Sequence, residues 1–282
     1  MVNKEIIMKN YGLDISKIQI KPEDYKFGSN IPLDVLKHDG QWDDYLPTYE
    51  PQAENYETWG CTVWGTQNQI ECLMKFAYGI EPNYDERYNY NLVELTEPGG
   101  DPQNVYQSIR DNGLVEGMFP PTSTYEEFSK PRPMDELSLI VGKKWLKEYE
   151  LTHEWITPSN PEKMKELIVS ALMYSPVALS VTAWTQDENG LYIDRGFQNN
   201  HWTLCYGYRD TPEGVVLKIF DSYDHSKKEL HPNHFVYFAK RIAIKKKVVE
   251  VKKKNLFSQL WQWFLKEKLV YRAFKIFNIN NK

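Results

Sequence analysis

The sequence predicts an α+β fold with two lobes, a helical lobe from the first half of the chain and an antiparallel β lobe from the second half. Between residues 62 and 76, apolar side chains recur at roughly helical spacing. From residue 177 to residue 244, short apolar runs of strand length follow one another. The 282 residues are enough for one large domain or two small ones, and 9 Trp, 19 Tyr and 12 Phe can fill a sizeable core.

Helical elements are expected mainly before residue 175. Asp101 can cap a helix, and Pro102 suits its first turn. Ser175-Pro176 should end the last helix, because proline cannot continue the hydrogen-bond ladder. In addition to the helix at 62–76, the sequence predicts helices at residues 101–113, 143–149 and 159–172.

The β lobe should follow directly after Pro176. Its segments are rich in apolar residues and are separated by turn-forming residues, a pattern typical of strands. The expected strands cover residues 177–181, 191–193, 202–208, 215–220 and 235–244.

Charge divides the chain into an acidic body and a basic end. The net charge is −5, yet the segment from Lys240 onward has 13 Lys and Arg against two Glu. We therefore expect an N-terminal arm at residues 1–45, a core domain at 46–244 and a basic tail at 245–282. Within the tail, aromatic and basic residues from Leu256 to Phe277 predict an amphipathic helix.

The basic tail has three interpretations. It could pack on the body as a solvated amphipathic helix. Its Trp, Phe and Lys mixture also suits a membrane surface with anionic lipids. Its charge alone would suit a virus particle, a protein partner or nucleic acid. No recognisable reading motif accompanies the lysines, so sequence-specific nucleic-acid recognition is not expected.

The three cysteines, Cys61, Cys72 and Cys205, do not suggest a disulfide framework. The N-terminus lacks the pattern of a signal peptide, so a reducing cytoplasm is the expected compartment, with virion association as an alternative. Cys72 and Cys205 are expected to be core thiols. Ligand spacing around His225, His231 and His234 is weak, and no phosphate-binding loop is present, so no metal or cofactor is expected.

Cys61 lies in Trp59-Gly60-Cys61-Thr62, at the start of the first helix. The positive end of a helix dipole favours thiolate over thiol. About 140 residues later, His201 opens a strand, and Asp221 ends the next one. A thiol nucleophile needs a base and a group that orients this base, and we assign these roles to His201 and Asp221.

Each of these residues alone has an ordinary explanation. A cysteine at a helix start and a histidine in a strand are usually structural, and Asp221-Ser222 could simply open a turn. The combined pattern of Cys, distant His and then a carboxylate, each on the expected element, favours a Cys–His site.

These segments resemble the papain-like cysteine peptidases (C1 family). The similarity is greatest to divergent bacterial and phage members in which Thr or Val follows the catalytic Cys. It covers Leu46 to Ala77 and Ser175 to about Ile242. Within the second range, Asn200 to Tyr208 is similar to the strand that carries the family's histidine, and Lys218 to Tyr223 to its Lys-Asn-Ser-Trp segment.

The resemblance implies a papain-like two-lobed fold that hydrolyses a peptide or protein substrate through a thioester acyl-enzyme. Asn55 falls six residues before Cys61, where the family has its oxyanion-hole Gln, and Gln52 is a second candidate. The backbone N–H of Cys61 would also stabilise the oxyanion.

Four neighbours of the site are expected to bind substrate or border the cleft: Trp59, Gly60, Trp202 and Tyr223. Tyr223 would replace the family's Trp as an aromatic shield of the histidine. Two alternatives stay open. One is a transglutaminase-like acyltransferase, and the other is a catalytically dead papain-like scaffold that acts as a structural or interaction protein.

Overall fold

A computed structural model describes residues 11–29, 32, 34–48, 52, 55–117, 122–130, 135–158, 160–196, 198–223 and 226–247. The chain divides into two units, Met1–Lys247 and Val248–Lys282. The second unit lies outside the described residues. The helix and the partners predicted for the basic tail therefore stay predictions.

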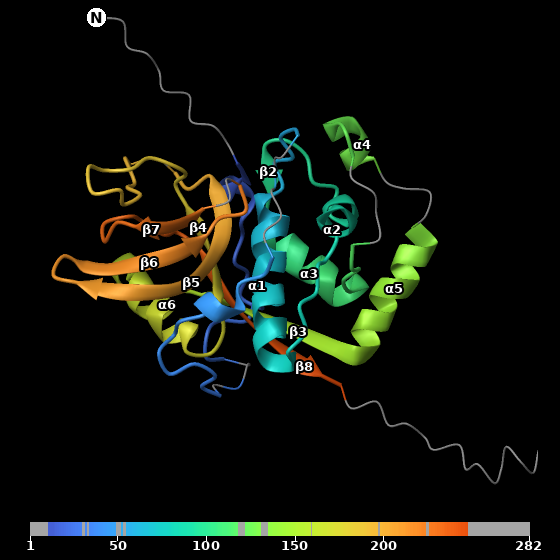
Figure 1. Ribbon diagram of the computed structural model, residues 1–282, viewed down its shortest axis with the longest axis horizontal. Helices are drawn as coiled ribbons and strands as arrows, with labels where there is room; N and C mark the ends of the chain where they lie inside the picture. Colours follow the sequence, from blue (N-terminus) through green and yellow to red (C-terminus); the bar gives the residue numbers. More distant parts are fainter. Residues whose placement is uncertain are drawn as a thin grey trace, which may run out of the picture. The chain divides into compact units, whose positions relative to one another are not determined.

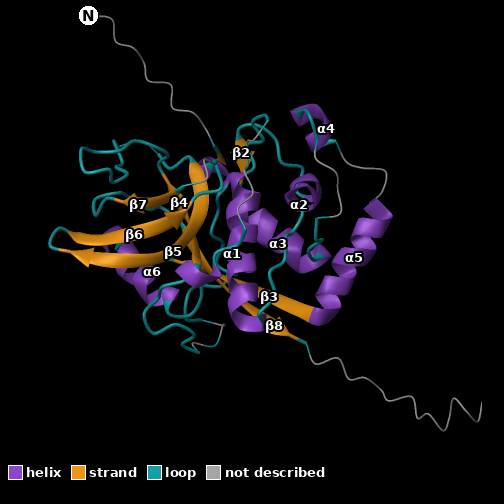
Figure 2. Ribbon diagram, in the orientation of Figure 1, coloured by secondary structure: helices purple, strands orange, loops and turns teal. Residues whose placement is uncertain are grey.

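The helical lobe forms around one long helix. Helix α1 runs between the large sheet on one side and helices α2, α3 and α5 on the other (Figures 1 and 2). The helices are α1 (Cys61–Tyr78), α2 (Glu86–Leu92), α3 (Pro102–Asn112), α4 (Tyr125–Ser129), α5 (Asp135–Glu148) and α6 (Met164–Leu172).

The β lobe is a six-stranded antiparallel sheet with the order β3-β8-β4-β5-β6-β7. Its strands are β3 (Tyr149–Ile156), β4 (Val177–Val181), β5 (His201–Thr211), β6 (Gly214–Phe220), β7 (Lys227–Leu230) and β8 (Ala239–Lys246). A separate parallel pair joins β1 (Gly12–Leu13) to β2 (Gly99–Gly100).

The helices predicted at residues 62–76, 101–113 and 159–172 and most predicted strands are confirmed, with shifted ends. The strand at residues 177–181 matches β4, and the strand expected at 235–244 begins only at Ala239. The strand expected at 191–193 is wrong, because Tyr192 makes only isolated bridges there. The helical segment expected at 143–149 belongs to α5, which is longer than expected, and strand β3 follows it directly.

Helix α1 approaches β5 closely at Gly65. A Cβ atom at Gly65 would lie 2.8 Å from the backbone oxygen of Trp202, closer than real Cβ contacts allow. Gly79 ends the helix in the left-handed conformation, with φ of 63°. The missing side chain at Gly65 therefore lets the first turn of α1 lie beside the start of β5.

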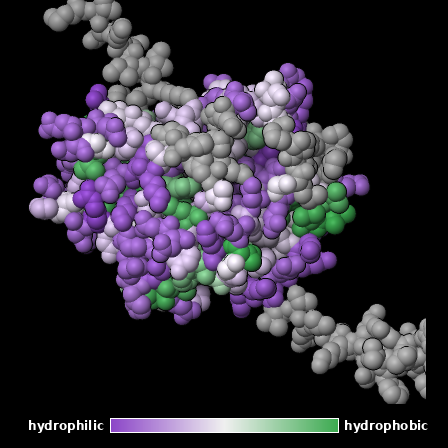
Figure 3. Space-filling view, in the orientation of Figure 1, coloured by the Kyte–Doolittle hydropathy of each residue, from purple (hydrophilic) through white to green (hydrophobic). Residues whose placement is uncertain are grey.

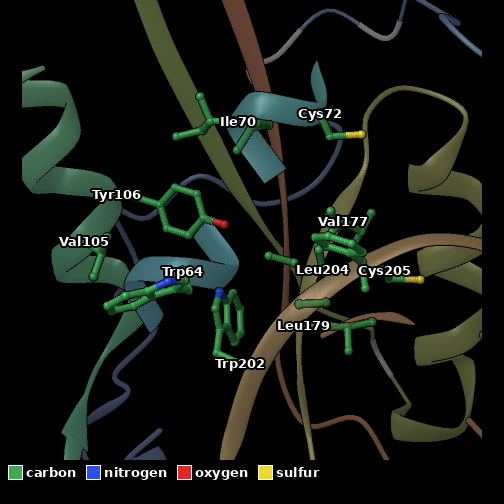
Figure 4. Close-up of a cluster of buried hydrophobic side chains, with 14 of the residues drawn as sticks. Trp64, Ile70, Cys72, Val105, Tyr106, Val177, Leu179, Trp202, Leu204 and Cys205 are labelled. Atoms are coloured by element: carbon green, nitrogen blue, oxygen red, sulfur yellow. The ribbon is translucent and has the colours of Figure 1, made fainter. Parts of the chain in front are cut away.

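The interior between α1 and the sheet is aromatic. Figure 4 shows Trp202 beside Trp64 and Tyr106, in a cluster that includes Leu204 and other apolar side chains. The Trp202 ring also packs edge-on against Trp155 of β3, with ring centroids 6.4 Å apart. This packing fixes the strand that carries His201.

Two of the contacts between the N-terminal arm and the body involve buried side chains. Trp42 is fully buried and donates its indole N–H to the carbonyl oxygen of Leu172. Farther toward the N-terminus, the backbone N–H of Gly28 donates to Glu154, whose carboxylate also pairs with the buried Arg241 at 2.9 Å. The described arm is therefore part of the packed unit.

The surface seen in Figure 3 is largely hydrophilic. Apolar side chains gather on the outer side of α5, where Leu137 and Ile140 are exposed. Among the described residues, none of the helices has the length and hydrophobicity that crossing a bilayer requires.

Candidate active site

Cys61 is the first residue of α1, and its thiol faces the start of β5. Its Sγ accepts a hydrogen bond from the backbone N–H of Trp202 at 3.3 Å. Trp202 directly follows His201 on β5. Residues 140 positions apart in the sequence are therefore neighbours in the fold.

His201 and Asp221 form a fully buried pair. His201 Nε2 lies 2.7 Å from Asp221 Oδ1, and both side chains are inaccessible to solvent. Asp221 follows the last residue of β6, which is antiparallel to β5, and this pairing brings the two side chains together. The other ring nitrogen, Nδ1, is buried without a hydrogen-bond partner among the described residues.

A lysine that was not predicted from the sequence, Lys228, is the third member of this group. The Nζ atom of Lys228 lies 2.7 Å from Asp221 Oδ2, and the lysine side chain is also fully buried. One carboxylate thus contacts an imidazole through one oxygen and an ammonium group through the other. Burial acts to raise the pKa of Asp221, but His201 and Lys228 outweigh it and lower the pKa below its usual value.

Aromatic rings surround the imidazole of His201. Trp184 lies edge-on to it with centroids 5.5 Å apart, and Tyr11 does so at 5.4 Å. The predicted shield, Tyr223, is farther away at 6.4 Å, and its hydroxyl donates to Glu57 at 2.6 Å. Trp184 and Tyr11 were not foreseen from the sequence.

Trp59 and Gly60, two of the expected substrate-binding residues, form the turn before Cys61. Trp59 has φ of 51°, a strained value for a residue with a large side chain. The backbone N–H of Trp59 donates to the side-chain carboxylate of Glu57 at 3.0 Å, and the Trp59 ring packs edge-on against Tyr125. Gly60 is required for space, since a Cβ there would meet the Trp64 ring at 2.4 Å.

The side chain of Trp202, expected to border the cleft, lies in the core instead. Successive residues of a strand point to opposite faces, so His201 and Trp202 cannot both face the thiol. The Trp202 side chain is fully buried against Trp155. Its contribution to the site is its backbone N–H.

The residues Tyr11 to Asp14, here called the strap, lie beside the turn that leads into Cys61. Gly12 and Leu13 pair in parallel with Gly99 and Gly100. A Cβ atom at Gly12 would lie only 2.1 Å from the backbone oxygen of Trp59, so the strap passes tightly beside the turn that precedes Cys61. In this arrangement, here called the covered form, Cys61 is fully buried.

Gln52, the second candidate for the oxyanion site, holds the strap. It is buried, and its side-chain amide donates to the carbonyl oxygen of Tyr11 at 2.9 Å. The Tyr11 N–H donates to the carbonyl of Asn200, next to His201, at 3.2 Å. Asn55, the first candidate, is exposed to solvent.

The surroundings of the Cys61 thiol raise its pKa in this covered form. Burial raises its pKa well above the usual value, and the negative charges of Asp221 and Glu57 add to this effect. The backbone N–H groups of Trp202 and Thr62 act in the opposite direction. Burial therefore opposes the thiolate that the start of the helix was predicted to favour.

The other two thiols, Cys72 and Cys205, are free and fully buried in the core. Of the three histidines whose spacing is weak for metal binding, His225 lies outside the described residues, and His234 is buried with both ring nitrogens hydrogen-bonded. Within the described ranges, no group of three or more His, Cys, Asp or Glu side chains is placed to hold a metal ion.

Simple patterns could have revealed some of the overlooked residues. Lys228 and Leu230 are two positions apart on β7 and share its buried face, while Lys227 is exposed. Gln52 carries the same amide as the family's residue, but it lies nine rather than six positions before Cys61. The two-residue strand of the strap has no periodicity that could indicate it.

No family model matches the sequence. No curated protein matches it either. Solved structures do, beginning with digestive procathepsin L 3 from the larval midgut of Tenebrio molitor, which is 16% identical with a TM-score of 0.54. That match covers 83% of this chain and 76% of the other.

Two further structures agree with it. Procathepsin L2 from the Tenebrio molitor midgut is 15% identical, has a TM-score of 0.51, and is matched over 83% of this chain and 84% of its own. Recombinant stem bromelain precursor is 16% identical, has a TM-score of 0.54, and is matched over 86% and 80%. The bacterial or phage type stays a prediction. The helices, the antiparallel sheet and these similarities together give this chain the papain-like fold of cysteine proteases.

Proposed function

We propose that this protein is a cysteine-type peptidase in which Cys61 attacks the peptide carbonyl, His201 carries the proton and Asp221 orients His201. The main support is that the three groups lie close together. His201 Nε2 lies 2.7 Å from Asp221, and the Cys61 thiol accepts a hydrogen bond from the backbone N–H of Trp202, the residue next to His201. This leaves His201 Nδ1 as the ring nitrogen that can serve the thiol.

The reaction proceeds through a thioester. The proton of Cys61 moves to His201, the sulfur bonds to the carbonyl carbon, and the leaving amine takes the proton from His201 as the C–N bond breaks. Water then attacks the thioester with His201 as base and regenerates the thiol. The oxyanion is stabilised by the Gln52 amide, which donates to a backbone carbonyl in the covered form, and by the N–H of Cys61 at the helix start.

The covered form is the resting state of this enzyme. In this form Tyr11 accepts the hydrogen bond of the Gln52 donor group that the reaction needs, and Cys61 is closed to water and substrate. Catalysis requires that the strap leave the turn at Trp59 and Gly60. The substrate is then an extended peptide that replaces the strap beside Gly99 and Gly100.

Thiol labelling and turnover test the proposal together. The full chain is treated with iodoacetamide, and labelling of each cysteine is followed by peptide mass spectrometry. We expect Cys61 to react much faster than Cys72 and Cys205, and we expect His201→Ala to remove this difference. The same protein should cleave a fluorogenic peptide mixture, and Cys61→Ser should abolish cleavage while Cys72→Ser preserves it.

Other results have clear meanings. Equal, slow labelling of all three thiols in the wild type, together with no cleavage of the peptide mixture, would contradict the peptidase and favour a dead scaffold. Incorporation of a primary amine in place of water would identify an acyltransferase instead.

A further inference from the structure

Lys228 is unusual because its charged side chain is fully buried. It lies on β7, the edge strand of the sheet, opposite Ile219 of β6. Its neighbour Lys227 is exposed, as lysine normally is, whereas the Lys228 side chain is inaccessible to solvent. Burying an ammonium group costs several kcal/mol unless charged and polar partners compensate it.

The compensating partners all lie around Asp221. Nζ of Lys228 is 2.7 Å from Asp221 Oδ2 and 2.7 Å from the hydroxyl oxygen of Ser226. The rings of Trp184 and Tyr192 lie 4.9 Å and 5.6 Å from the same atom, within the range of cation–π attraction.

One indole ring also links the lysine to the imidazole. Trp184 packs edge-on against His201 with centroids 5.5 Å apart, and the Lys228 ammonium lies over the same ring. The buried residues His201, Asp221 and Lys228 and the partly buried Trp184 therefore form one cluster, here called the charge cluster.

We propose that Lys228 is a positioning residue for the Cys61–His201 pair, which holds Asp221 in place and balances its negative charge beside the reacting thiol. This inference rests on the proposed function. The carboxylate oxygen Oδ1 can then orient His201, while the charge of Asp221 is largely cancelled through Oδ2. The Asp221–Lys228 pair, which has no net charge, thereby orients His201 as a neutral hydrogen-bond acceptor would.

The balance of charge matters because Asp221 acts on the thiol. After burial, the Asp221 charge is among the causes that raise the pKa of Cys61. The Lys228 ammonium group, which contacts the other oxygen of the Asp221 carboxylate, attracts the negative thiolate and so opposes this rise in the pKa of Cys61. The titratable groups around the charge cluster are Cys61, Glu57, Tyr11, Tyr223 and Tyr192, and all of them stay unchanged in a Lys228 variant.

The pH profile of Cys61 alkylation measures this balance. For a thiol paired with an imidazole, the plot of alkylation rate against pH has two sloping parts, here called limbs, one for each proton that the pair loses. Removing the Lys228 cation leaves an extra negative charge, which retains both protons more strongly. For Lys228→Met we therefore expect both limbs to move to higher pH by on the order of one unit.

Two partner variants complete the test. Asp221→Asn alone leaves an unbalanced cation and should move both limbs to lower pH. The double variant Asp221→Asn with Lys228→Met has a neutral pair and should return the limbs close to their wild-type positions. Lys227→Met removes a lysine from the exposed face of the same strand and should leave the profile unchanged.

The experiment uses iodoacetamide on the full chain, with Cys61 labelling followed by mass spectrometry. If Lys228→Met does not fold, the comparison between Asp221→Asn and the double variant decides the same question. Limbs that stay at the wild-type pH in every folded variant would overturn the proposal and leave Lys228 a purely structural residue. A wild-type profile with a single limb would instead contradict the Cys61–His201 pair, and hence the proposed function.

Discussion

Gly65 of α1 and Trp202 of β5 touch without room for another atom, since a Cβ at Gly65 would lie 2.8 Å from the Trp202 carbonyl oxygen. This contact sets the distance between the helix that carries Cys61 and the strand that carries His201. The geometry of the site therefore depends on a residue that does not belong to it.

Gly65→Ala should separate the two elements. We expect a loss of stability of about 1–3 kcal/mol from overpacking. A displaced nucleophile should also lower kcat/KM on the order of 100-fold. The matched control is Gly79→Ala, at the other end of α1, where no atom lies within 4 Å but φ is +63°. It should cost stability through backbone strain and leave kcat/KM of the folded protein unchanged. Equal loss of activity in both variants would contradict this interpretation.

Much of the site could be predicted from the sequence because its residues lie at the ends of regular elements. Cys61 begins a helix with clear periodicity, His201 begins β5, and Asp221 follows β6. The core position of Trp202 also follows from strand alternation once His201 is placed.

Other features depend on contacts between distant segments and leave little local signal. Strand β3 follows α5 without a break, so the helical pattern at residues 143–149 hides its start. The strap is two residues of strand pairing. Gln52 reaches the site through a loop, where the number of residues before Cys61 does not determine direction.

Adding a single methyl group at Gly12 should weaken the packing of the strap against the turn that precedes Cys61. A Cβ at Gly12 would clash with the Trp59 carbonyl at 2.1 Å, and φ of +113° adds strain. Because such strain costs about 1–3 kcal/mol, Gly12→Ala should accelerate Cys61 alkylation by roughly tenfold or more.

Gly28→Ala provides the control for the strap. Gly28 also has a left-handed φ, of +84°, but no atom lies within 4 Å of its Cβ position. It should leave the labelling rate at the wild-type value. A Gly12→Ala rate equal to that of Gly28→Ala would show that the strap does not limit access to the thiol.

Gln52→Ala should change labelling and turnover in opposite directions. Loss of the bond to Tyr11 loosens the strap, so iodoacetamide should reach Cys61 faster. Loss of an oxyanion donor should lower kcat/KM for a peptide by about 100- to 1,000-fold. Asn55→Ala, at the exposed candidate, should alter neither rate. If Asn55→Ala reduces turnover and Gln52→Ala does not, the oxyanion assignment is wrong.

Acid should destabilise the β lobe through His234. Its Nε2 accepts from the N–H of Thr182 at 3.1 Å, and its Nδ1 donates to the carbonyl of Tyr192 at 3.0 Å, so the bonded ring is neutral. Burial lowers the pKa of His234 from 6.5 to about 4. Below pH 6.5 the unfolded chain takes up a proton that the folded protein excludes until about pH 4. The stability is therefore complete above pH 6.5, and about 3 kcal/mol is lost as the pH falls to 4.

Urea denaturation between pH 7 and pH 4 measures this loss. His234→Gln should be less stable than the wild type at pH 7 and should lose less stability as the pH falls. Asp101, whose pKa burial raises to about 6, acts in the opposite direction over part of this range, but it is identical in both proteins. The exposed His38→Gln serves as control and should reproduce the wild-type slope. A slope in His234→Gln as steep as in the wild type would show that another group causes the acid sensitivity. His153, whose pKa burial lowers to about 2, would then be the next residue to test.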